Sequence, residues 1–141
     1  MLIVLYKLKD EENIKEILFL SQEFNFDVVI IHRENANIRY EELKKIKDFK
    51  IYYTFDDFLK EYSNKKFYFI ETYGNKFLYE AELDKNGIYV FGAEDYGIPY
   101  HEIEKVKDKE VIKIPVKKPG SYNVTSTVVM LLTELKCRGL L

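Results

Sequence analysis

The sequence predicts an α/β protein in which a mostly parallel sheet carries helices on both faces. Short apolar runs alternate along the chain with segments of helical periodicity. Several runs are continuously apolar, such as Val28-Val29-Ile30-Ile31, and such strands are typical of parallel sheets that are covered on both faces. The length of 141 residues suits one hydrophobic core, so a single domain over residues 1–141 is expected.

The elements follow from local patterns. The expected strands are Leu2–Tyr6, Phe26–Ile31, Lys50–Tyr53, Phe67–Glu71, Gly87–Phe91 and Val111–Ile114. The expected helices are Asp10–Phe24, Tyr40–Ile46, Thr54–Tyr62, Pro99–Val106 and Asn123–Arg138. Asp10 and Thr54 are expected to cap their helices, because their side chains can accept hydrogen bonds from the first turn. In the first helix, Ile14, Ile17, Leu18, Ser21 and Phe24 share one face, which is predicted to be buried. Residues 76–83 fit either a strand or a lid.

Composition restricts the classes of function. A net charge of −2 argues against a broad surface that binds nucleic acid through many phosphates. The 22 Lys and Arg residues still allow a local basic patch. One cysteine and two histidines are poor material for a metal site, so no metal is expected. No apolar run approaches the ~20 residues of a membrane helix. No membrane partner is therefore expected, and a cytoplasmic location is predicted.

Two strand-to-helix loops carry the most information. The first reads Phe91-Gly92-Ala93-Glu94-Asp95-Tyr96-Gly97-Ile98-Pro99, and the second contains Ile114-Pro115 and then Ser121-Tyr122-Asn123-Val124-Thr125. Glycines in such loops allow close backbone approach or a positive φ. Ser121 and Asn123 can cap the last helix and leave its other N–H groups free toward a ligand. Either loop alone would be unremarkable, because Gly and Pro occur in most turns.

Together, in this order and spacing, the loops resemble motifs two and three of the SpoU branch of the SPOUT RNA methyltransferases. The resemblance covers about a third of the chain closely. It implies a C-terminal trefoil knot, S-adenosylmethionine as cofactor, and methyl transfer to a ribose 2′-OH of tRNA or rRNA. It also implies a homodimer whose active site lies at the subunit interface.

The resemblance assigns roles to individual residues. Asn123, Glu94 and Ser121 are expected at the reacting centre. Asn123 would position the substrate, Ser121 the cofactor, and Glu94 would order the loop or a basic partner. The expected cofactor-binding residues are Thr72, Gly92, Gly97, Ile114 and Ser121.

The chain departs from the family in motif one, which is an N-x-G-x-x-x-R helix start whose arginine is taken to help activate the ribose hydroxyl. Asn13 is present, but Lys15 stands at the glycine position and Phe19 at the arginine position. Three alternatives stay open. In the first, Lys15 or Arg33 replaces the arginine. In the second, the methylated group is not a ribose. In the third, the protein binds the cofactor without catalysing a reaction. A neighbouring subunit or a partner protein is a further source of the missing group.

Two features favour dimerisation. Phe19 is expected on the exposed side of its helix, where it would contact a second subunit or stack on an RNA base. The last helix has an apolar stripe formed by Val124, Val128, Leu131, Leu132 and Leu135. Val129 and Met130 lie on its other faces, as expected for a helix that packs on both the sheet and a partner.

Two other functions remain possible on the sequence. One is a SPOUT-fold binding or assembly protein that lost the chemistry, which the missing arginine and the acidic charge favour. The other is an unrelated flavodoxin-like protein with accidental loop similarity, which would neither bind S-adenosylmethionine nor form a tight dimer.

Overall fold

The computed structural model describes residues 1–116 and 123–141. In these ranges the strands are β1 (Leu2–Tyr6), β2 (Asp27–Ile31), β3 (Lys50–Tyr52), β4 (Phe67–Ile70), β5 (Lys76–Phe77), β6 (Ile88–Phe91) and β7 (Lys109–Lys113). They form one sheet in the order β3-β2-β1-β6-β4-β7-β5. Every pairing between these strands is parallel, which confirms the predicted class.

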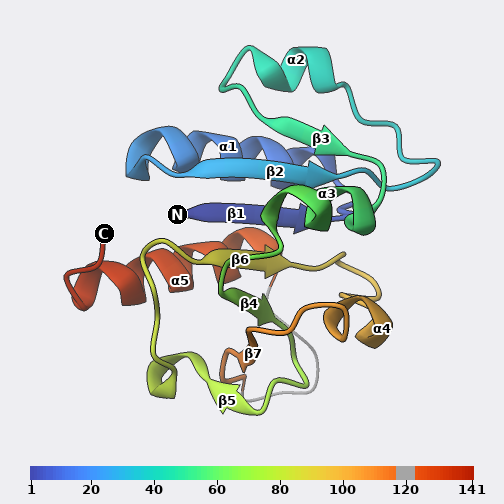
Figure 1. Cartoon of the computed structure of the whole chain (residues 1–141). Coiled ribbons are helices and arrows are strands. Elements are labelled where there is room, and N and C mark those ends of the chain that lie inside the picture. The colour runs from blue at the N-terminus through green and yellow to red at the C-terminus, as the bar shows by residue number, and fades with distance from the viewer. Residues whose placement is uncertain (117–122) are drawn as a thin grey trace.

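Helices cover both faces of this sheet (Figure 1). They are α1 (Glu11–Phe24), α2 (Tyr40–Lys44), α3 (Phe55–Tyr62), α4 (Tyr100–Ile103) and α5 (Val124–Cys137), with a short 3-10 helix η1 (Leu78–Glu80). α1 and α5 pack side by side on one face, whereas α3 and α4 lie on the other.

The two faces are built by alternate residues of the same strands. In β1, Ile3 and Leu5 join the cluster under α1 and α5, while Val4 and Tyr6 join the cluster under α3 and α4. All four are at most 2% exposed. Since successive strand side chains point to opposite faces, a strand between two helical layers must be apolar at every position. The continuous apolar runs are thereby explained.

The predicted helix caps are confirmed. The Asp10 carboxylate accepts a hydrogen bond from the Glu12 N–H at 3.0 Å, and Thr54 Oγ1 accepts one from the Asp57 N–H at 3.1 Å. The predicted buried stripe of α5 is also confirmed, because its five residues are between 0% and 7% exposed.

Three details differ from the prediction. Phe24 is 36% exposed rather than buried, because it is the last residue of α1 and is followed by a left-handed Asn25. β7 begins at Lys109 instead of Val111, where Glu110 forms an ion pair with Lys76 at 3.1 Å. Residues 76–83 contain neither a full strand nor a lid but the short β5 and then η1.

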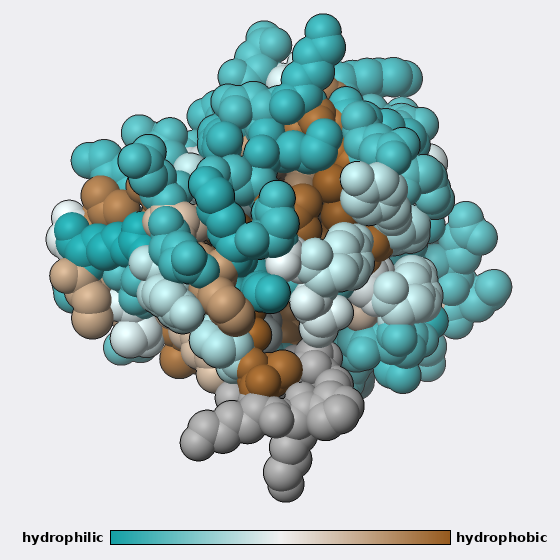
Figure 2. Space-filling model, turned by 90° about the horizontal axis from the view of Figure 1, so that it is seen from below, coloured by the Kyte–Doolittle hydropathy of each residue, from teal (hydrophilic) through white to brown (hydrophobic). Residues whose placement is uncertain are grey.

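The sheet order fixes where a site can form. β1 and β6 are adjacent although they are far apart in sequence, so the loops that follow them meet at the carboxyl edge of the sheet. Figure 2 shows one face, on which hydrophilic side chains cover most of the area and hydrophobic surface is limited to separate patches. The predicted knot depends on the path of residues 117–122, which lie outside the described residues, and so it stays a prediction.

Candidate functional site

A pocket of about 540 Å³ opens at the carboxyl edge of the sheet. Its apolar wall is formed by Ile70, Phe91, Ile114, Val116 and Val124. Its polar and glycine-rich side includes Glu71, Thr72, Tyr73, Gly92, Glu94, Asp95, Tyr96, Gly97, Asn123 and Thr127. A mostly preformed cleft of this size, with an apolar wall and a few convergent polar groups, is typical of sites for small cofactors.

Glu94 connects three parts of the chain. Its carboxylate accepts hydrogen bonds from the N–H groups of Lys9 at 2.9 Å and Asp10 at 3.2 Å, and from Asn13 Nδ2 at 2.9 Å. The side-chain oxygen of Asn13, Oδ1, in turn accepts a hydrogen bond from the Thr125 hydroxyl at the start of α5, at 3.5 Å. Glu94 therefore fixes its loop to the start of α1, and through Asn13 to the start of α5.

A second carboxylate holds the other end of the same loop. Glu71, which directly follows β4, accepts a hydrogen bond from the Ile98 N–H at 2.6 Å and one from the Thr72 N–H at 3.3 Å. Burial raises the pKa of the Glu71 carboxyl, and the hydrogen bonds from Ile98 and Thr72 only partly oppose this shift. A carboxyl group that ionises reluctantly thus lies in the wall of the pocket.

Both glycines of the loop are required by its shape. Gly97 has a φ of +68°, and a Cβ there would lie 2.3 Å from Glu71 Oε1. At Gly92 a Cβ would lie 2.7 Å from the backbone of Gly97. The chain folds back between them, with the Gly97 N–H bonded to the Ala93 carbonyl at 2.9 Å. The glycines therefore allow the loop to close on itself and on Glu71.

The structure brings most of the predicted site residues together. Thr72, Gly92, Glu94, Gly97, Ile114 and Asn123 all line the pocket. Asn123 also caps α5, because its Oδ1 accepts a hydrogen bond from the Ser126 N–H at 2.8 Å. Ser121 lies outside the described residues. The individual roles toward cofactor and substrate stay predictions.

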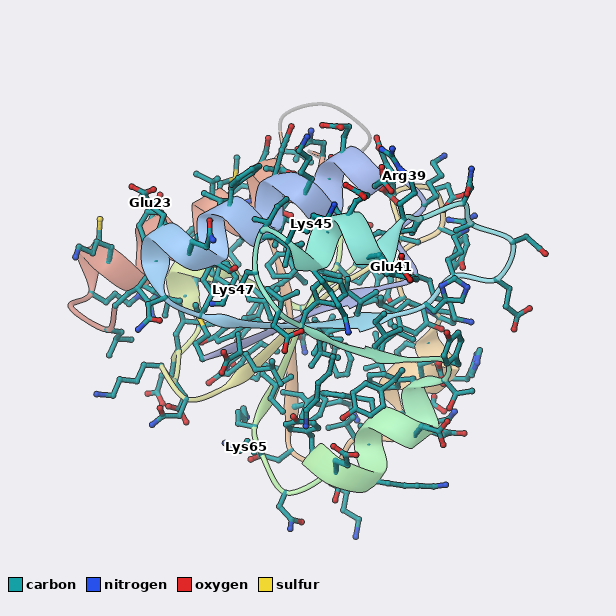
Figure 3. All side chains as sticks on the ribbon, turned by 90° about the horizontal axis from the view of Figure 1, so that it is seen from above. Glu23, Arg39, Glu41, Lys45, Lys47 and Lys65 are labelled. Atoms are coloured by element: carbon teal, nitrogen blue, oxygen red, sulfur yellow. The ribbon has the colours of Figure 1, made fainter. Side chains whose placement is uncertain are left out.

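The chain has three arginines, and only Arg33 lies beside the pocket. Its guanidinium bonds to both oxygens of Asp95 and lies 5.0 Å from the ring centre of Tyr96. This pairing holds the pKa of the Asp95 carboxyl well below its usual range. Arg39 pairs with Glu11 over the start of α1 (Figure 3), and Arg138 binds Glu134 and backbone carbonyls at the far end of α5.

The residues at the motif-one positions do not line the pocket. Lys15 is exposed on α1. Phe19 is 50% exposed, as predicted, and lies in a separate shallow depression with Leu20, Phe24 and Val129. Of Lys15 and Arg33, the two residues that could replace the motif-one arginine, Arg33 is therefore the one near the pocket.

Sequence reasoning missed several contacts of the site. It recognised Asn13 only as a motif match, although this side chain links Glu94 to α5. It also missed the Arg33–Asp95 pair and the Tyr73 hydroxyl, which donates to the Ile98 carbonyl at 2.7 Å. No local pattern reveals these contacts, because their partners are 25 to 112 residues apart. His32, which directly follows β2, is bonded to the Tyr40 hydroxyl through Nδ1 at 2.5 Å.

In residues 1–116 and 123–141 no group of three or more acidic, histidine or cysteine side chains is arranged to hold a metal ion. Within the same ranges no helix is both long and apolar enough to cross a membrane.

Several solved structures share this fold. A protein from work on the 2-OH methylation of C/U34 on tRNA superposes with a TM-score of 0.83 at 20% identity, covering 98% of this chain and 96% of that one. AviRb, a SpoU methyltransferase from Streptomyces viridochromogenes solved with AdoMet, gives 0.77 at 10% identity. That match covers 98% of this chain and 57% of AviRb. An AdoMet-bound rRNA methyltransferase from Sinorhizobium meliloti gives 0.74 at 14% identity, covering 99% and 56%.

No curated protein matches the sequence significantly. The model of the SpoU rRNA Methylase family, in contrast, matches residues 1–133, which is nearly the whole chain. The matched region includes β1, the Glu94 loop and most of α5, and therefore every described element of the pocket. The chain belongs to the SpoU rRNA Methylase family of RNA methyltransferases.

Proposed function

We propose that this protein transfers a methyl group from S-adenosylmethionine to a ribose 2′-OH of tRNA or rRNA in the cytoplasm. The observation that carries the proposal is the pocket at the carboxyl edge, in which the loops after β4, β6 and β7 and the start of α5 converge. The family membership and the AdoMet-bound relatives of the same fold support it.

The pocket fits the proposed cofactor in size and chemistry. Ile70, Phe91 and Ile114 offer an apolar wall for a flat purine ring. Glu71 and Thr72, which follow β4, offer polar atoms for a ribose and an amino acid moiety. Bound S-adenosylmethionine supplies an activated methyl group, so the protein has to align the nucleophile with it and accept one proton.

The protein's own residues provide alignment. The Glu94 and Glu71 contacts fix the loop between β6 and α4 from both ends before any substrate arrives. Such preorganisation is valuable, because methyl transfer depends on a near-linear approach of the nucleophile. Asn123, whose Oδ1 is engaged in the helix cap, is proposed to donate from Nδ2 to the substrate. Arg33 is proposed to take the place of the motif-one arginine beside the ribose.

We also propose that the protein is a homodimer. Phe19 and Val129 are 50% and 42% exposed and lie next to each other across α1 and α5. Together with Leu20 and Phe24 they form the apolar part of a depression that Glu16 and Glu23 border. Burial of this surface against a second copy would remove it from water.

Calorimetric titration with S-adenosylmethionine and S-adenosylhomocysteine tests the proposal first. About one site per subunit with micromolar affinity is expected. Methyl transfer to bulk tRNA and rRNA is then assayed with the wild type and Asn123→Ala. Absence of binding by either ligand would contradict the methyltransferase assignment. Binding without transfer to any RNA would favour the alternative of a non-catalytic SPOUT-fold protein, which the phenylalanine at position 19 supports.

A further inference from the structure

Four exposed tyrosines lie at the edge of the sheet where the pocket opens. Tyr53 follows β3, Tyr73 follows β4, and Tyr96 and Tyr100 follow β6, so all four lie at the carboxyl edge of the sheet. They are 66%, 50%, 53% and 62% exposed, respectively. Tyr73 and Tyr96 line the pocket itself. We call these four residues the tyrosine rim.

Contacts to neighbouring residues hold three of the rings in place. The Tyr53 ring packs edge-on against His32 with 5.2 Å between ring centres. Arg33, the next residue, lies over the Tyr96 ring. The Tyr73 hydroxyl is bonded to the Ile98 carbonyl. Rings that are fixed before binding lose little conformational entropy when a ligand stacks on them.

The described cations beside the rim are already paired with a carboxylate. Arg33, which lies over the Tyr96 ring, and Lys9 both face Asp95, at 2.8 and 3.9 Å. Glu71 and Glu94 add acidic groups in the pocket wall. In the part of the chain that the structure describes, this pairing favours a ligand that is recognised through uncharged flat faces.

From this arrangement we infer that the tyrosine rim binds unpaired RNA by stacking of its bases on the tyrosine rings. Exposed aromatic rings next to an arginine are the usual platform for single-stranded bases, whereas paired bases are stacked on each other and inaccessible. The substrate of the proposed methyltransferase is then a nucleotide in a loop or single-stranded segment. The inference depends on the proposed function in one respect, which is that the ligand is an RNA.

The described cations of the rim predict how strongly the affinity for RNA depends on salt concentration. Affinity for single strands falls with a slope of about −0.7 per phosphate contact in a plot of log affinity against log salt concentration. Within residues 1–116 and 123–141, the two cations beside Tyr96, Arg33 and Lys9, would contribute roughly −1 to −2 to this slope. A basic groove with many phosphate contacts would give a much steeper slope.

The test measures fluorescence anisotropy of a labelled short unstructured RNA, alone and annealed to its complement, without cofactor. The variant is Tyr53→Leu combined with Tyr96→Leu, and the conservative variant replaces both residues by Phe. The control is Tyr79→Leu. Tyr79 is 61% exposed but lies on η1, where its carbonyl accepts from Arg138 at the end of α5, roughly 20 Å along that helix from the pocket.

The wild type is expected to prefer the unpaired strand, and the leucine variant to bind it roughly tenfold or more weakly. The phenylalanine and Tyr79→Leu variants should bind like the wild type. The inference would be overturned if the leucine variant bound the unpaired strand as tightly as the wild type does. It would also be overturned if the wild type bound the duplex as tightly as the unpaired strand, or bound neither RNA. Cofactor titration of the wild type separates the two proposals, because preferential binding of unpaired RNA without any cofactor binding would refute only the methyltransferase.

Discussion

Arg33 and Asp95 form a two-pronged ion pair, with Nη1–Oδ1 and Nη2–Oδ2 distances of 2.9 and 2.8 Å, across 62 residues of sequence. The pair joins the loop after β2 to the loop after β6 at the mouth of the pocket. A planar guanidinium matches a carboxylate in this way, whereas a lysine can only offer a point charge.

Arg33→Lys is therefore expected to lower methyl transfer to RNA by roughly ten- to a hundredfold, because the loop and the rim lose their alignment. Affinity for S-adenosylmethionine should change only slightly, since Arg33 is not part of the pocket lining. Single-turnover assays and calorimetry measure the two effects. Arg39→Lys is the matched control, because it weakens a similar pair with Glu11 away from the pocket. Equal losses in both variants would contradict a role of Arg33 in the reaction.

Glu94→Gln should lower the free energy of unfolding by about 1–3 kcal/mol, the usual contribution of hydrogen bonds to a charged acceptor. The amide that replaces one oxygen would face either the Lys9 N–H or both the Asp10 N–H and Asn13 Nδ2. Urea denaturation measures the loss, and Glu104→Gln, at an exposed position, is the control. A change no larger than that of the control would mean that the Glu94 contacts do not stabilise the fold.

Gly97→Ala is expected to cost at least about 1–2 kcal/mol for the left-handed backbone alone, plus the clash with Glu71. Gly139→Ala isolates the first contribution, since Gly139 has a φ of +73° and open space around its Cα. The difference between the two free energies of unfolding measures the clash. Cofactor affinity should fall only in Gly97→Ala, and equal behaviour of the two variants would refute the close approach of Glu71.

Glu71 makes stability depend on pH in a defined direction. Because burial raises its pKa in the folded protein, the folded state holds this proton more firmly than the unfolded state does. Its contribution to stability therefore falls as the pH rises above the ordinary range of a glutamate, about 4. Glu71→Gln should gain in melting temperature relative to the wild type between pH 4 and pH 7. The test is how the difference in melting temperature changes with pH. Its absolute size is not the test, because the weakened bond to Thr72 lowers the melting temperature of the variant at every pH. A difference that does not vary with pH would show an ordinary pKa.

Phe19→Asp combined with Val129→Asp should produce monomers, because two charges would be placed in the apolar depression of α1 and α5. Sedimentation velocity measures the state of assembly. Lys15→Asp adds an aspartate to the exposed part of the same helix outside the depression and should leave the dimer intact. A monomeric wild type would refute the dimer, and a dimeric double variant would place its interface elsewhere.

Local patterns predicted the fold well, because each signal needed only nearby residues. Asp10, Thr54 and Asn123 cap helices through contacts within three residues. Continuous apolar runs predicted strands buried on both faces, and parallel strands bring their carboxyl ends to one edge. This rule explains why Gly92 and Ile114, which the family resemblance named, line one pocket.

The partners within the pocket could not be predicted, because they depend on which strands are neighbours. The adjacency of β1 and β6 places Glu94 against the start of α1. The exposure of Phe24 likewise depends on the left-handed Asn25 that ends α1 immediately after it. A periodic pattern identifies a face but not the point where its burial ends.

The link from Glu94 through Asn13 to Thr125 has a consequence for synthesis of the protein. Its three members are spread over nearly the full chain, so the pocket cannot exist until α5 has left the ribosome. On the proposed function, a chain interrupted before α5 lacks part of the pocket lining and should bind no cofactor. Binding of the proposed cofactor would then report completion of the fold and would protect the complete chains from unfolding.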